Sequence, residues 1–327
     1  MKKLKKVLIV ELYDHPKVLE NTYHLINSRC SLTYFMNKDK QSSYQKLFPS
    51  ANNANVIINK FHSSTMFFLL LFYGRKYDYI NISTGPEGGH FSELFNVIFF
   101  YFCCLIYKKK IILTIKNIRP YLSSTGGLFS FFRSKAIRYI RRFTFESKSM
   151  KKTFEKYSDV EFPLLGVSYD RYSDLLDKKL QNKINYNYNK EEIKIGILGV
   201  IDETRRDYSS IIKVLKNTNF DKNYSITFVT LGACYGGNNN EVIKAIAEYT
   251  KIDCIKGIIS DKEFDYRGTA CDLLISPLLP MHEYGTFKGS GSFGDAVYLR
   301  KRIILPKFVD MKREFKDIAI YYNDIDD

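Results

Sequence analysis

The sequence predicts an α/β protein with two doubly wound domains, each a parallel sheet covered by helices. Short β-branched runs without polar alternation recur along the chain, helical stretches lie between them, and a polar segment divides the series in two. Such runs are typical of parallel strands covered on both faces. Their alternation with helices predicts βαβ units. At 327 residues the chain is long enough for two domains with cores of their own.

The expected elements follow one another along the chain. The strands are Val7–Leu12, Tyr79–Ser83, Ile111–Ile115, Ile193–Leu198, Ser225–Leu231, Leu273–Pro277 and Arg302–Leu305, and helices are expected at Tyr208–Lys216 and Glu241–Thr250. The start, "MKKLKKVLIVE", has the charges of a signal peptide. Its apolar run ends at Val10 before Glu11, and no small-residue cleavage site follows. It is therefore interpreted as the first strand.

A polar stretch marks the expected domain boundary. "LLDKKLQNKINYNYNKEEIK", residues 175–194, is rich in Asn and Lys and has no long apolar run, and "IKIGILG" then starts a new strand. We expect an N-terminal Rossmann-like domain over 1–175, a linker over 176–192 and a C-terminal Rossmann-like domain over 193–327.

Composition narrows the classes of partner. The formal net charge of +15 favours anionic partners, and the basic residues are spread along the chain. No zinc-finger spacing or RNA-binding signature accompanies them, so we expect no nucleic acid but an anionic membrane surface or a phosphate-bearing substrate. None of the six cysteines forms a CxxC pair, which favours reduced thiols in a cytoplasmic protein. No metal and no cofactor are expected.

Two apolar segments of the first half suggest helices. "LFNVIFFYFCCLIY", Leu94–Tyr107, is shorter than the roughly 20 residues of a spanning helix. It is predicted to be a buried helix, with a membrane dip as the alternative. "GGLFSFFRSKAIRYIRRFTF" is predicted to be an amphipathic helix. Its apolar stripe is Phe129, Phe132, Ala136, Ile140 and Phe143, opposite Lys135, Arg138, Arg141 and Arg142. The stripe is expected to pack into the domain, and the basic face either to be solvated or to attract anionic lipid.

"IKIGILGVIDETRRDYSSIIKVLK" contains the first candidate site. The strand ends at Gly199, and Arg205 and Arg206 precede a helix. Ligands of such sheets bind outside the carboxyl ends of the strands. Two arginines at a helix start can hold a diphosphate by bidentate hydrogen bonds. The alternative is a solvated basic loop.

"GSGSFGDAVYLRKRIILP" contains the second candidate site. Its glycines let backbone N–H groups approach a phosphate, and the helix dipole favours the anion. The residues proposed here are Gly289, Ser290, Gly291, Ser292, Gly294 and Asp295. Asp295 is expected at the helix start, where it either accepts hydrogen bonds from ribose hydroxyls or is stabilised by the dipole as a first-turn residue.

Together these two motifs resemble the C-terminal domain of GT-B glycosyltransferases, the family that builds bacterial surface polysaccharides such as O-antigen and capsule. In that family a basic residue after a Gly-ended strand contacts the donor diphosphate, and Arg206 stands at that place. Asp295 stands where the family usually has a Glu that holds the donor ribose. "FPLLGVSYDRYSDLL" is similar to the interdomain crossover, and "FESKSMKKTFEKY" to the segment before it. The resemblance implies two Rossmann-like domains facing across a cleft, an acceptor domain over 1–175 and a nucleotide-sugar domain over 193–327.

The sequence departs from the family at three places. Val200 stands where Arg is frequent, and Glu283 lies several residues upstream of the family's acidic position. The chain ends at "IAIYYNDIDD", where relatives continue into helices that cross back onto the first domain. The second domain is therefore expected to be short at its C-terminus.

The first half offers candidates for a general base and for acceptor binding. "NISTGPEGGHFSELF" follows a strand and carries Glu87 and His90, and "ELYDHP" carries Asp14 and His15. Any of these side chains can take a proton from an acceptor hydroxyl. The alternative is that His90 merely begins a helix after a tight turn. Two basic residues of "TIKNIRPYL" are expected to meet an acceptor phosphate, namely Lys116 and Arg119.

The resemblance implies transfer of a sugar from a nucleoside-diphosphate sugar to a hydroxyl of a lipid-linked oligosaccharide. We expect the protein in the cytoplasm, peripheral on the inner face of the membrane. Two alternatives stay open: a GT-B-like phosphotransferase that makes polyol-phosphate polymers, and a non-catalytic partner of another transferase.

Overall fold

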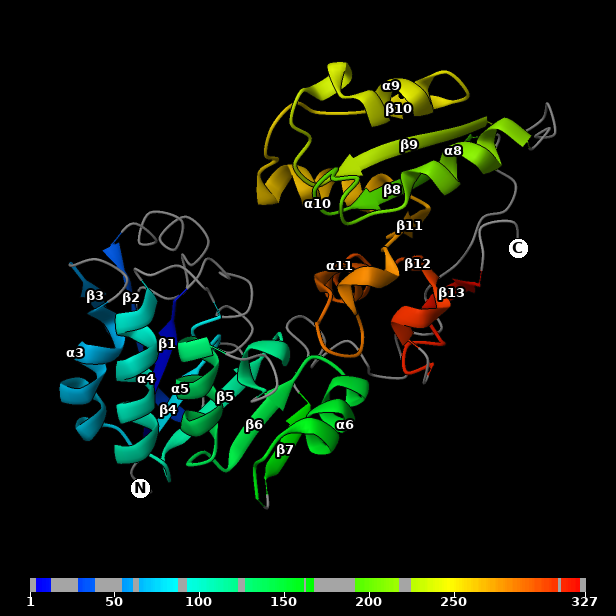
Figure 1. Cartoon of the computed structure of the whole chain (residues 1–327). Coiled ribbons are helices and arrows are strands. Elements are labelled where there is room, and N and C mark those ends of the chain that lie inside the picture. The colour runs from blue at the N-terminus through cyan, green and yellow to red at the C-terminus, as the bar shows by residue number, and fades with distance from the viewer. Residues whose placement is uncertain are drawn as a thin grey trace. The chain divides into compact units, whose positions relative to one another are not determined.

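The computed structural model describes residues 4–12, 29–38, 55–60, 65–87, 93–122, 127–161, 163–167, 192–217, 225–310 and 313–323 (Figure 1). By its contacts the chain divides into two compact units. Unit 1 is Met1–Ser173 with Phe287–Gly289, and unit 2 is Asp174–Thr286 with Ser290–Asp327. Except for Glu192, the predicted linker lies outside the described residues.

Unit 1 is a seven-stranded sheet in the order β3-β2-β1-β4-β5-β6-β7, with every pair of neighbours parallel. The strands are β1 Lys5–Glu11, β2 Cys30–Asn37, β3 Asn55–Asn59, β4 Tyr79–Ile82, β5 Ile111–Ile115, β6 Arg142–Phe145 and β7 Leu164–Val167. Its described α-helices are α3 Met66–Tyr73, α4 Leu94–Ile106, α5 Gly127–Ile137 and α6 Lys148–Tyr157. Short 3-10 turns lie at Gly74–Lys76 and Arg119–Tyr121. Figure 1 shows α3, α4 and α5 side by side on one face of this sheet.

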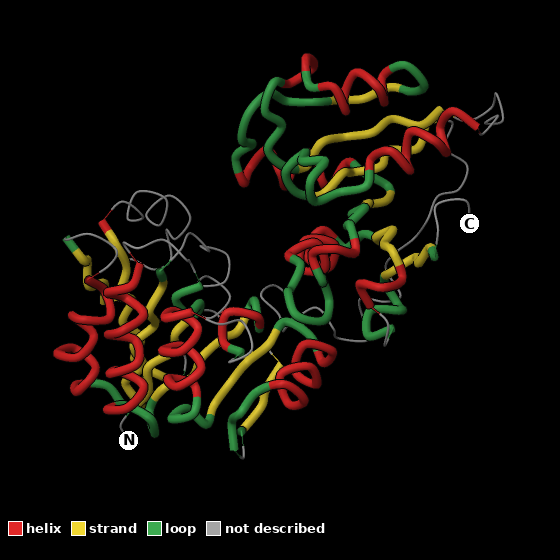
Figure 2. The backbone as a smooth tube through the Cα atoms, in the orientation of Figure 1, coloured by secondary structure: helices red, strands yellow, loops and turns green. Residues whose placement is uncertain are grey.

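Unit 2 is a six-stranded parallel sheet in the order β10-β9-β8-β11-β12-β13. The strands are β8 Glu192–Leu198, β9 Ser225–Leu231, β10 Lys251–Asp253, β11 Leu273–Ile275, β12 Arg302–Pro306 and β13 Ala319–Tyr322. The described α-helices are α8 Tyr208–Asn217, α9 Glu241–Ala247, α10 Asp261–Ala270 and α11 Gly291–Leu299, with 3-10 turns at Gly237–Asn239, Pro280–His282 and Lys307–Asp310. Figure 2 shows the alternation of helices and strands that the sequence predicts. The predicted α/β class, with two doubly wound sheets, is confirmed.

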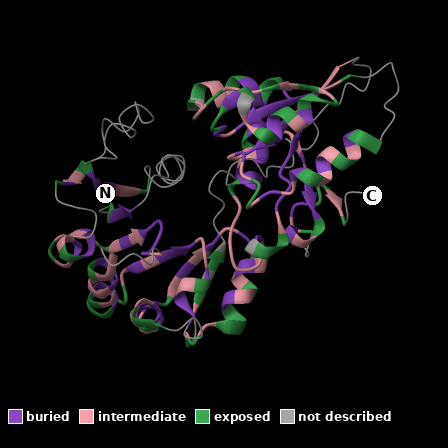
Figure 3. Ribbon diagram, turned by 45° about the horizontal axis from the view of Figure 1, so that its top comes forward, coloured by how far each residue is buried: buried purple, intermediate pink, exposed green. Residues whose placement is uncertain are grey.

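Strand β1 shows why the apolar runs lack alternation. Leu8 and Val10 belong to one buried cluster, and Val7 and Ile9 belong to another. Because successive side chains of a strand point to opposite faces, both faces of β1 are covered. Figure 3 shows the strands of the sheets largely buried.

The same polar pairing sets the strand register in both units. The Asp78 carboxylate before β4 accepts a hydrogen bond from the Lys6 N–H (2.9 Å), and the Asp78 N–H donates to Lys6 O (2.9 Å). Before β11, Asp272 exchanges the corresponding bonds with Lys194 (2.9 and 2.8 Å). Each Asp thereby aligns the start of a strand with the first strand of its unit.

The long amphipathic helix predicted after Gly126 is wrong. Helix α5 ends at Ile137, and Arg142–Phe145 forms strand β6, which pairs with β5. The predicted faces are kept despite the break, since Ala136, Ile140 and Phe143 of the apolar stripe are buried and Arg138 and Arg141 of the basic face are exposed. Apolar residues spaced for a helix also fit a short helix followed by a strand, so the spacing alone does not locate the break.

The buried helix predicted at Leu94–Tyr107 is buried on one side only. Helix α4 buries Val97, Phe100 and Cys103, whereas Phe102 and Ile106 are exposed. The run is apolar all round, and such a pattern by itself indicates burial on every side.

Candidate functional site

A left-handed glycine ends β8 and makes room for a buried arginine. Gly199 has φ +78°, a conformation that strains other residues. A Cβ atom at Gly199 would lie 2.1 Å from Nη2 of Arg206. The glycine therefore lets the guanidinium lie against the backbone at the carboxyl end of β8.

Arg206 is held there by its backbone. Its N–H donates to Asp202 O (3.1 Å), and Arg206 forms an antiparallel bridge with Leu278 in the segment after β11. Flanking bonds run from the Asp207 N–H to Pro277 O (2.7 Å) and from the Leu279 N–H to Arg205 O (3.1 Å). The loops after β8 and β11, two neighbouring strands, thus fix the position of Arg206.

Two of the three guanidinium nitrogens of Arg206 are buried without an acceptor among the described residues. The residue is only 7% exposed, and these two nitrogens are Nε and Nη1. Burial lowers the pKa of the guanidinium, which nevertheless stays protonated in proteins. A buried cation with unsatisfied donors is costly unless an anion binds it.

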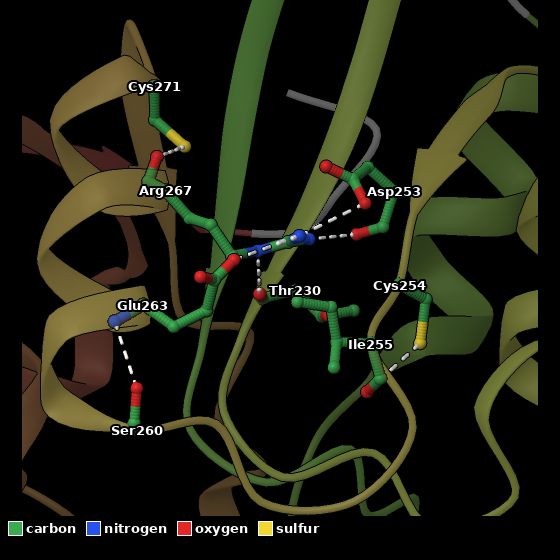
Figure 4. A network of polar contacts seen from close by, with 8 residues as sticks. All are labelled: Thr230, Asp253, Cys254, Ile255, Ser260, Glu263, Arg267 and Cys271. Atoms are coloured by element: carbon green, nitrogen blue, oxygen red, sulfur yellow. Dashed lines mark hydrogen bonds and ion pairs between the residues drawn. The ribbon is translucent and has the colours of Figure 1, made fainter.

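A second buried arginine of unit 2 shows the ordinary structural arrangement (Figure 4). Arg267 of α10 donates from Nε to Thr230 O (3.2 Å) and from Nη2 to Asp253 O (2.6 Å). Its Nη1 donates to Asp253 Oδ1 (3.1 Å). Arg267 ties α10 to β9 and β10, and its donors are satisfied within the protein. Arg206 and Arg267 are equally buried but differ in this respect.

The two arginines of the predicted pair have different partners. Arg205 donates from Nε and Nη2 to the Tyr284 hydroxyl (3.1 and 2.6 Å). Tyr284 is itself buried, in the loop after β11. Arg205 therefore braces that loop, and Arg206 is the arginine whose donors remain for a ligand.

The N-terminus of α11 lies at the same sheet edge and is attached to the same loop. Ser290 caps the helix, and its hydroxyl accepts a hydrogen bond from the Ser292 N–H (3.4 Å). The Ser292 hydroxyl is 2.8 Å from that of Ser276, which directly follows β11. A Cβ atom at Gly291 would meet no other atom within 4 Å, so the space at this helix start is open.

Other residues of the glycine-rich motif are placed differently from expectation. Helix α11 begins at Gly291, so Asp295 is its fifth residue and not a first-turn residue as predicted. It is half-buried, one turn into the helix, while Gly294 is buried within the same turn. Gly289 groups by its contacts with unit 1, where its N–H donates to Lys116 O (2.9 Å).

In unit 1 the candidate base Glu87 lies in the loop after β4. Burial raises the pKa of Glu87 to about 7, although the Lys116 charge, a hydrogen bond from the Asn117 N–H and the Arg133 charge oppose the shift. A Cβ atom at Gly85 in this loop would lie 2.0 Å from the Tyr121 hydroxyl, so the glycine allows the loop to pack closely. A carboxyl group that titrates near neutral pH is suited to general base catalysis.

Lys116 lies at the same edge, directly after β5. Its Nζ is 3.8 Å from Oε1 of Glu146, which directly follows β6, and both side chains are mostly buried. The loops after three neighbouring strands thus bring Glu87, Lys116 and Glu146 to one edge of the sheet. Arg119 is exposed in the turn that follows, and its N–H donates to Asn117 Oδ1 (3.2 Å).

Three candidate bases lie outside the described residues, namely Asp14, His15 and His90. Sequence reasoning missed Glu146, because β6 was hidden in the predicted helix, and missed Tyr284 and Ser276. The placement of Glu146 directly after a strand would have identified it. Within the described ranges, no group of His, Cys, Asp and Glu side chains could hold a metal ion.

A cavity of about 930 Å³ in unit 2 lies away from these residues. Its lining includes Glu192, Thr227 and Lys251, which lie at or near the amino ends of β8, β9 and β10. Ligands of parallel sheets bind at the opposite edge, so we assign it no part in the site. None of the described helices combines the length and the hydropathy needed to cross a membrane.

No protein-family model and no curated protein matches this sequence. Solved structures do match. An α,α-trehalose-phosphate synthase (UDP-forming) from Burkholderia xenovorans, in complex with glucose-6-phosphate, has a TM-score of 0.57 and 9% identity, over 98% of this chain and 90% of that one. WaaG, a glycosyltransferase involved in lipopolysaccharide biosynthesis, has a TM-score of 0.53 and 8% identity, over 96% and 85%. A UDP-GlcNAc 2-epimerase from Neisseria meningitidis, bound to UDP-GlcNAc, has a TM-score of 0.50 and 11% identity, over 92% and 82%. These similarities show the GT-B fold.

Proposed function

We propose that the protein is a glycosyltransferase that moves a sugar from a nucleoside-diphosphate sugar to a hydroxyl of a lipid-linked oligosaccharide, in the synthesis of a cell-surface polysaccharide. Unit 2 binds the donor, and unit 1 supplies the base and binds the acceptor.

The observation that carries this proposal is the buried Arg206 with unsatisfied donors. It lies at the carboxyl end of β8, and the loop that positions it also carries Ser276, to which α11 is attached. A guanidinium and an open helix N-terminus both favour a phosphate group. A diphosphate offers enough oxygens to accept from both.

Each proposed residue has a chemical role in the transfer. Arg206 and the start of α11 bind the diphosphate, and the Asp295 carboxylate accepts hydrogen bonds from ribose hydroxyls. Glu87 takes the proton of the acceptor hydroxyl as its oxygen bonds to the anomeric carbon. The bond from that carbon to the diphosphate breaks, and Arg206 stabilises the charge of the leaving nucleoside diphosphate. Lys116 and Arg119 bind a phosphate of the acceptor, while Asp14, His15 and His90 remain alternative bases.

The comparisons support the donor class more strongly than the acceptor. The UDP-GlcNAc 2-epimerase is bound to UDP-GlcNAc, and the trehalose-phosphate synthase is described as UDP-forming. WaaG is a glycosyltransferase involved in lipopolysaccharide biosynthesis. A lipid-linked acceptor is consistent with the net charge of +15, which favours an anionic membrane surface. Membrane association on the cytoplasmic side is part of this proposal.

Calorimetry with a panel of nucleoside diphosphates tests donor binding directly. We expect one nucleotide to bind with much higher affinity than the others. When a lipid-linked acceptor is added, the sugar conjugate of that nucleotide should release it. Binding without release under any acceptor would favour a non-catalytic partner. Transfer of a polyol phosphate with release of a nucleoside monophosphate would favour the phosphotransferase.

Asp295→Asn tests the ribose contact. The amide keeps the size of the side chain but removes its charge and one acceptor, so affinity for the nucleoside diphosphate should fall by about tenfold. The fifth helical position makes no cap, so the helix start should be unaffected, and the melting temperature is measured alongside the affinity. If the variant loses stability but keeps its affinity for the nucleotide, Asp295 is a structural residue.

Gly291→Val tests the approach of the phosphate to α11. Gly291 is not in the left-handed region, and the space around its missing Cβ is open, so the valine should be accommodated in the fold. The branched side chain would instead fill the space proposed for the diphosphate, and affinity should fall by roughly 100-fold or more. Calorimetry that gives the affinity of the parent protein would place the diphosphate elsewhere.

A further inference from the structure

Three helices of unit 1 expose apolar side chains over a continuous surface. We define the aromatic face by six exposed residues of α3, α4 and α5, namely Phe68, Phe72, Phe102, Ile106, Leu128 and Phe131. Phe72 is 60% exposed, Ile106 55% and Phe131 54%. Scattered exposed apolar residues are ordinary, but a contiguous apolar patch marks an interaction surface.

Ring contacts make this surface continuous across the helices. Phe68 of α3 lies 5.1 Å from Phe99 of α4, measured between ring centroids, and Phe99 lies 6.2 Å from Phe102. Tyr101 of α4 lies 5.8 Å from Phe132 of α5. The three helices lie side by side on the sheet (Figure 1), and the ring contacts between them join their aromatic side chains into one layer.

Positive charge predominates beside this layer, although one of the cations, Arg138, is paired with a carboxylate. The helices α3, α4 and α5 contain no Asp or Glu. Exposed cations follow their carboxyl-terminal ends: Arg75 and Lys76 after α3, Lys108 and Lys109 after α4, and Arg138 after α5, where it pairs with Asp159. We call these five residues the basic edge. Because the three helices connect parallel strands in the same sense, their ends meet at one edge of the sheet.

We propose that the aromatic face docks on the surface of a bilayer that contains anionic lipid. The aromatic and aliphatic side chains enter the boundary between headgroups and acyl chains, and the basic edge binds lipid phosphates. At 13 residues α4 is too short to span a bilayer, so the face lies in the plane of the interface.

A bilayer complements this surface better than a second copy of the chain does. It supplies an apolar layer and an anionic layer next to each other, as the aromatic face and the basic edge require. A second copy would present the same cations, and its aromatic face has no carboxylates in α3, α4 or α5 to pair with them. The inference deepens the membrane association of the proposed function.

Flotation with vesicles tests the docking without any sugar substrate. The protein of residues 1–327 is mixed with vesicles of phosphatidylcholine alone, or of phosphatidylcholine with phosphatidylglycerol. We expect binding to the anionic vesicles, and at least roughly tenfold weaker binding for the triple variant Phe72→Ser, Ile106→Ser, Phe131→Ser, because these side chains lose their apolar insertion. A matched control, Leu164→Ser, Ile258→Ser, Tyr266→Ser, removes apolar residues elsewhere that are at least as exposed, and it should bind like the parent.

The basic edge has its own variant. Lys108→Glu with Lys109→Glu should weaken binding to anionic vesicles by roughly tenfold or more and leave the weaker binding to neutral vesicles unchanged. Equal binding of the parent protein to both vesicle types would overturn the role of the basic edge.

Two further outcomes would overturn the docking itself. One is equal vesicle binding by the triple variant and its control. The other has two parts: the parent protein does not bind vesicles, and it forms a dimer in sedimentation experiments without lipid. The triple variant would then be monomeric under the same conditions. Calorimetry with nucleotide on the triple variant keeps the two proposals separate, because loss of vesicle binding with intact nucleotide binding leaves donor binding unaffected.

Discussion

Replacing Arg206 with Met is expected to weaken binding of the nucleoside diphosphate by about 100-fold or more, because charge-assisted hydrogen bonds contribute about 1.5–3 kcal/mol each and at least two are lost. The substitution should not destabilise the fold. Within the described part of the chain, Nε and Nη1 of Arg206 have no hydrogen-bond partner, so an apolar side chain would remove a buried cation whose donors are only partly satisfied. The free energy of unfolding should stay the same or rise. Calorimetry and urea unfolding measure the two quantities.

Arg267→Met is the matched control for that experiment. Arg267 is as buried as Arg206, but it donates to Thr230 O and to Asp253. Its loss leaves buried acceptors unsatisfied and should lower the free energy of unfolding by about 1–3 kcal/mol, without a direct effect on the nucleotide. If Arg206→Met instead loses stability and keeps nucleotide affinity, Arg206 is structural and the donor site is wrongly placed.

Replacing Glu87 with Gln is expected to reduce the rate of transfer by a factor of about 100 to 10,000, the usual contribution of a general base. Since the pKa of Glu87 is raised to about 7, the parent rate should rise with pH and level off above neutrality. The variant should lack this rise. Nucleotide affinity, which the proposal assigns to unit 2, should be unaffected.

Glu87→Gln lowers the rate but is expected to raise the stability of the fold. The sign of this effect follows from the raised pKa of Glu87. The folded state holds the Glu87 proton up to about pH 7, whereas the unfolded chain releases it near the ordinary value of 4.5. Stability therefore falls as pH rises through this window. At pH 8 Glu87→Gln should raise the free energy of unfolding by about 1–3 kcal/mol, and at pH 4 it should change it little.

Glu155→Gln on the exposed side of α6 is the control for both measurements and should change neither. A variant of Glu87 that keeps the full rate and its rise with pH would pass the role of base to one of the alternative residues. A pH profile of unfolding that is the same with and without Glu87 would show that the carboxyl group is not buried.

Much of the fold could be predicted from the sequence where strands are rich in β-branched residues. Ile111–Ile115 and Ser225–Leu231 were predicted with the bounds that the structure has. Strand β2, with Thr33 and Asn37 both buried, was missed. Its polar residues do not indicate a buried strand, because the burial of β2 depends on the neighbouring strands β1 and β3. Strand β13 was missed because its pairing with β12 is a long-range contact that no local pattern contains.

The sequence by itself determined the alternation of strands and helices, the glycine after β8 and the presence of two arginines before α8, because these depend on residue type and local spacing. Only the tertiary structure decided which arginine keeps its donors. The hydroxyl of Tyr284, 79 residues away, accepts hydrogen bonds from Nε and Nη2 of Arg205. The loops after β8 and β11 bury Arg206, and its Nε and Nη1 find no acceptor among the described residues. Burial and pairing depend on neighbours that are distant in the chain. For that reason the raised pKa of Glu87 and the exposure of the aromatic face could not be predicted from the local sequence either.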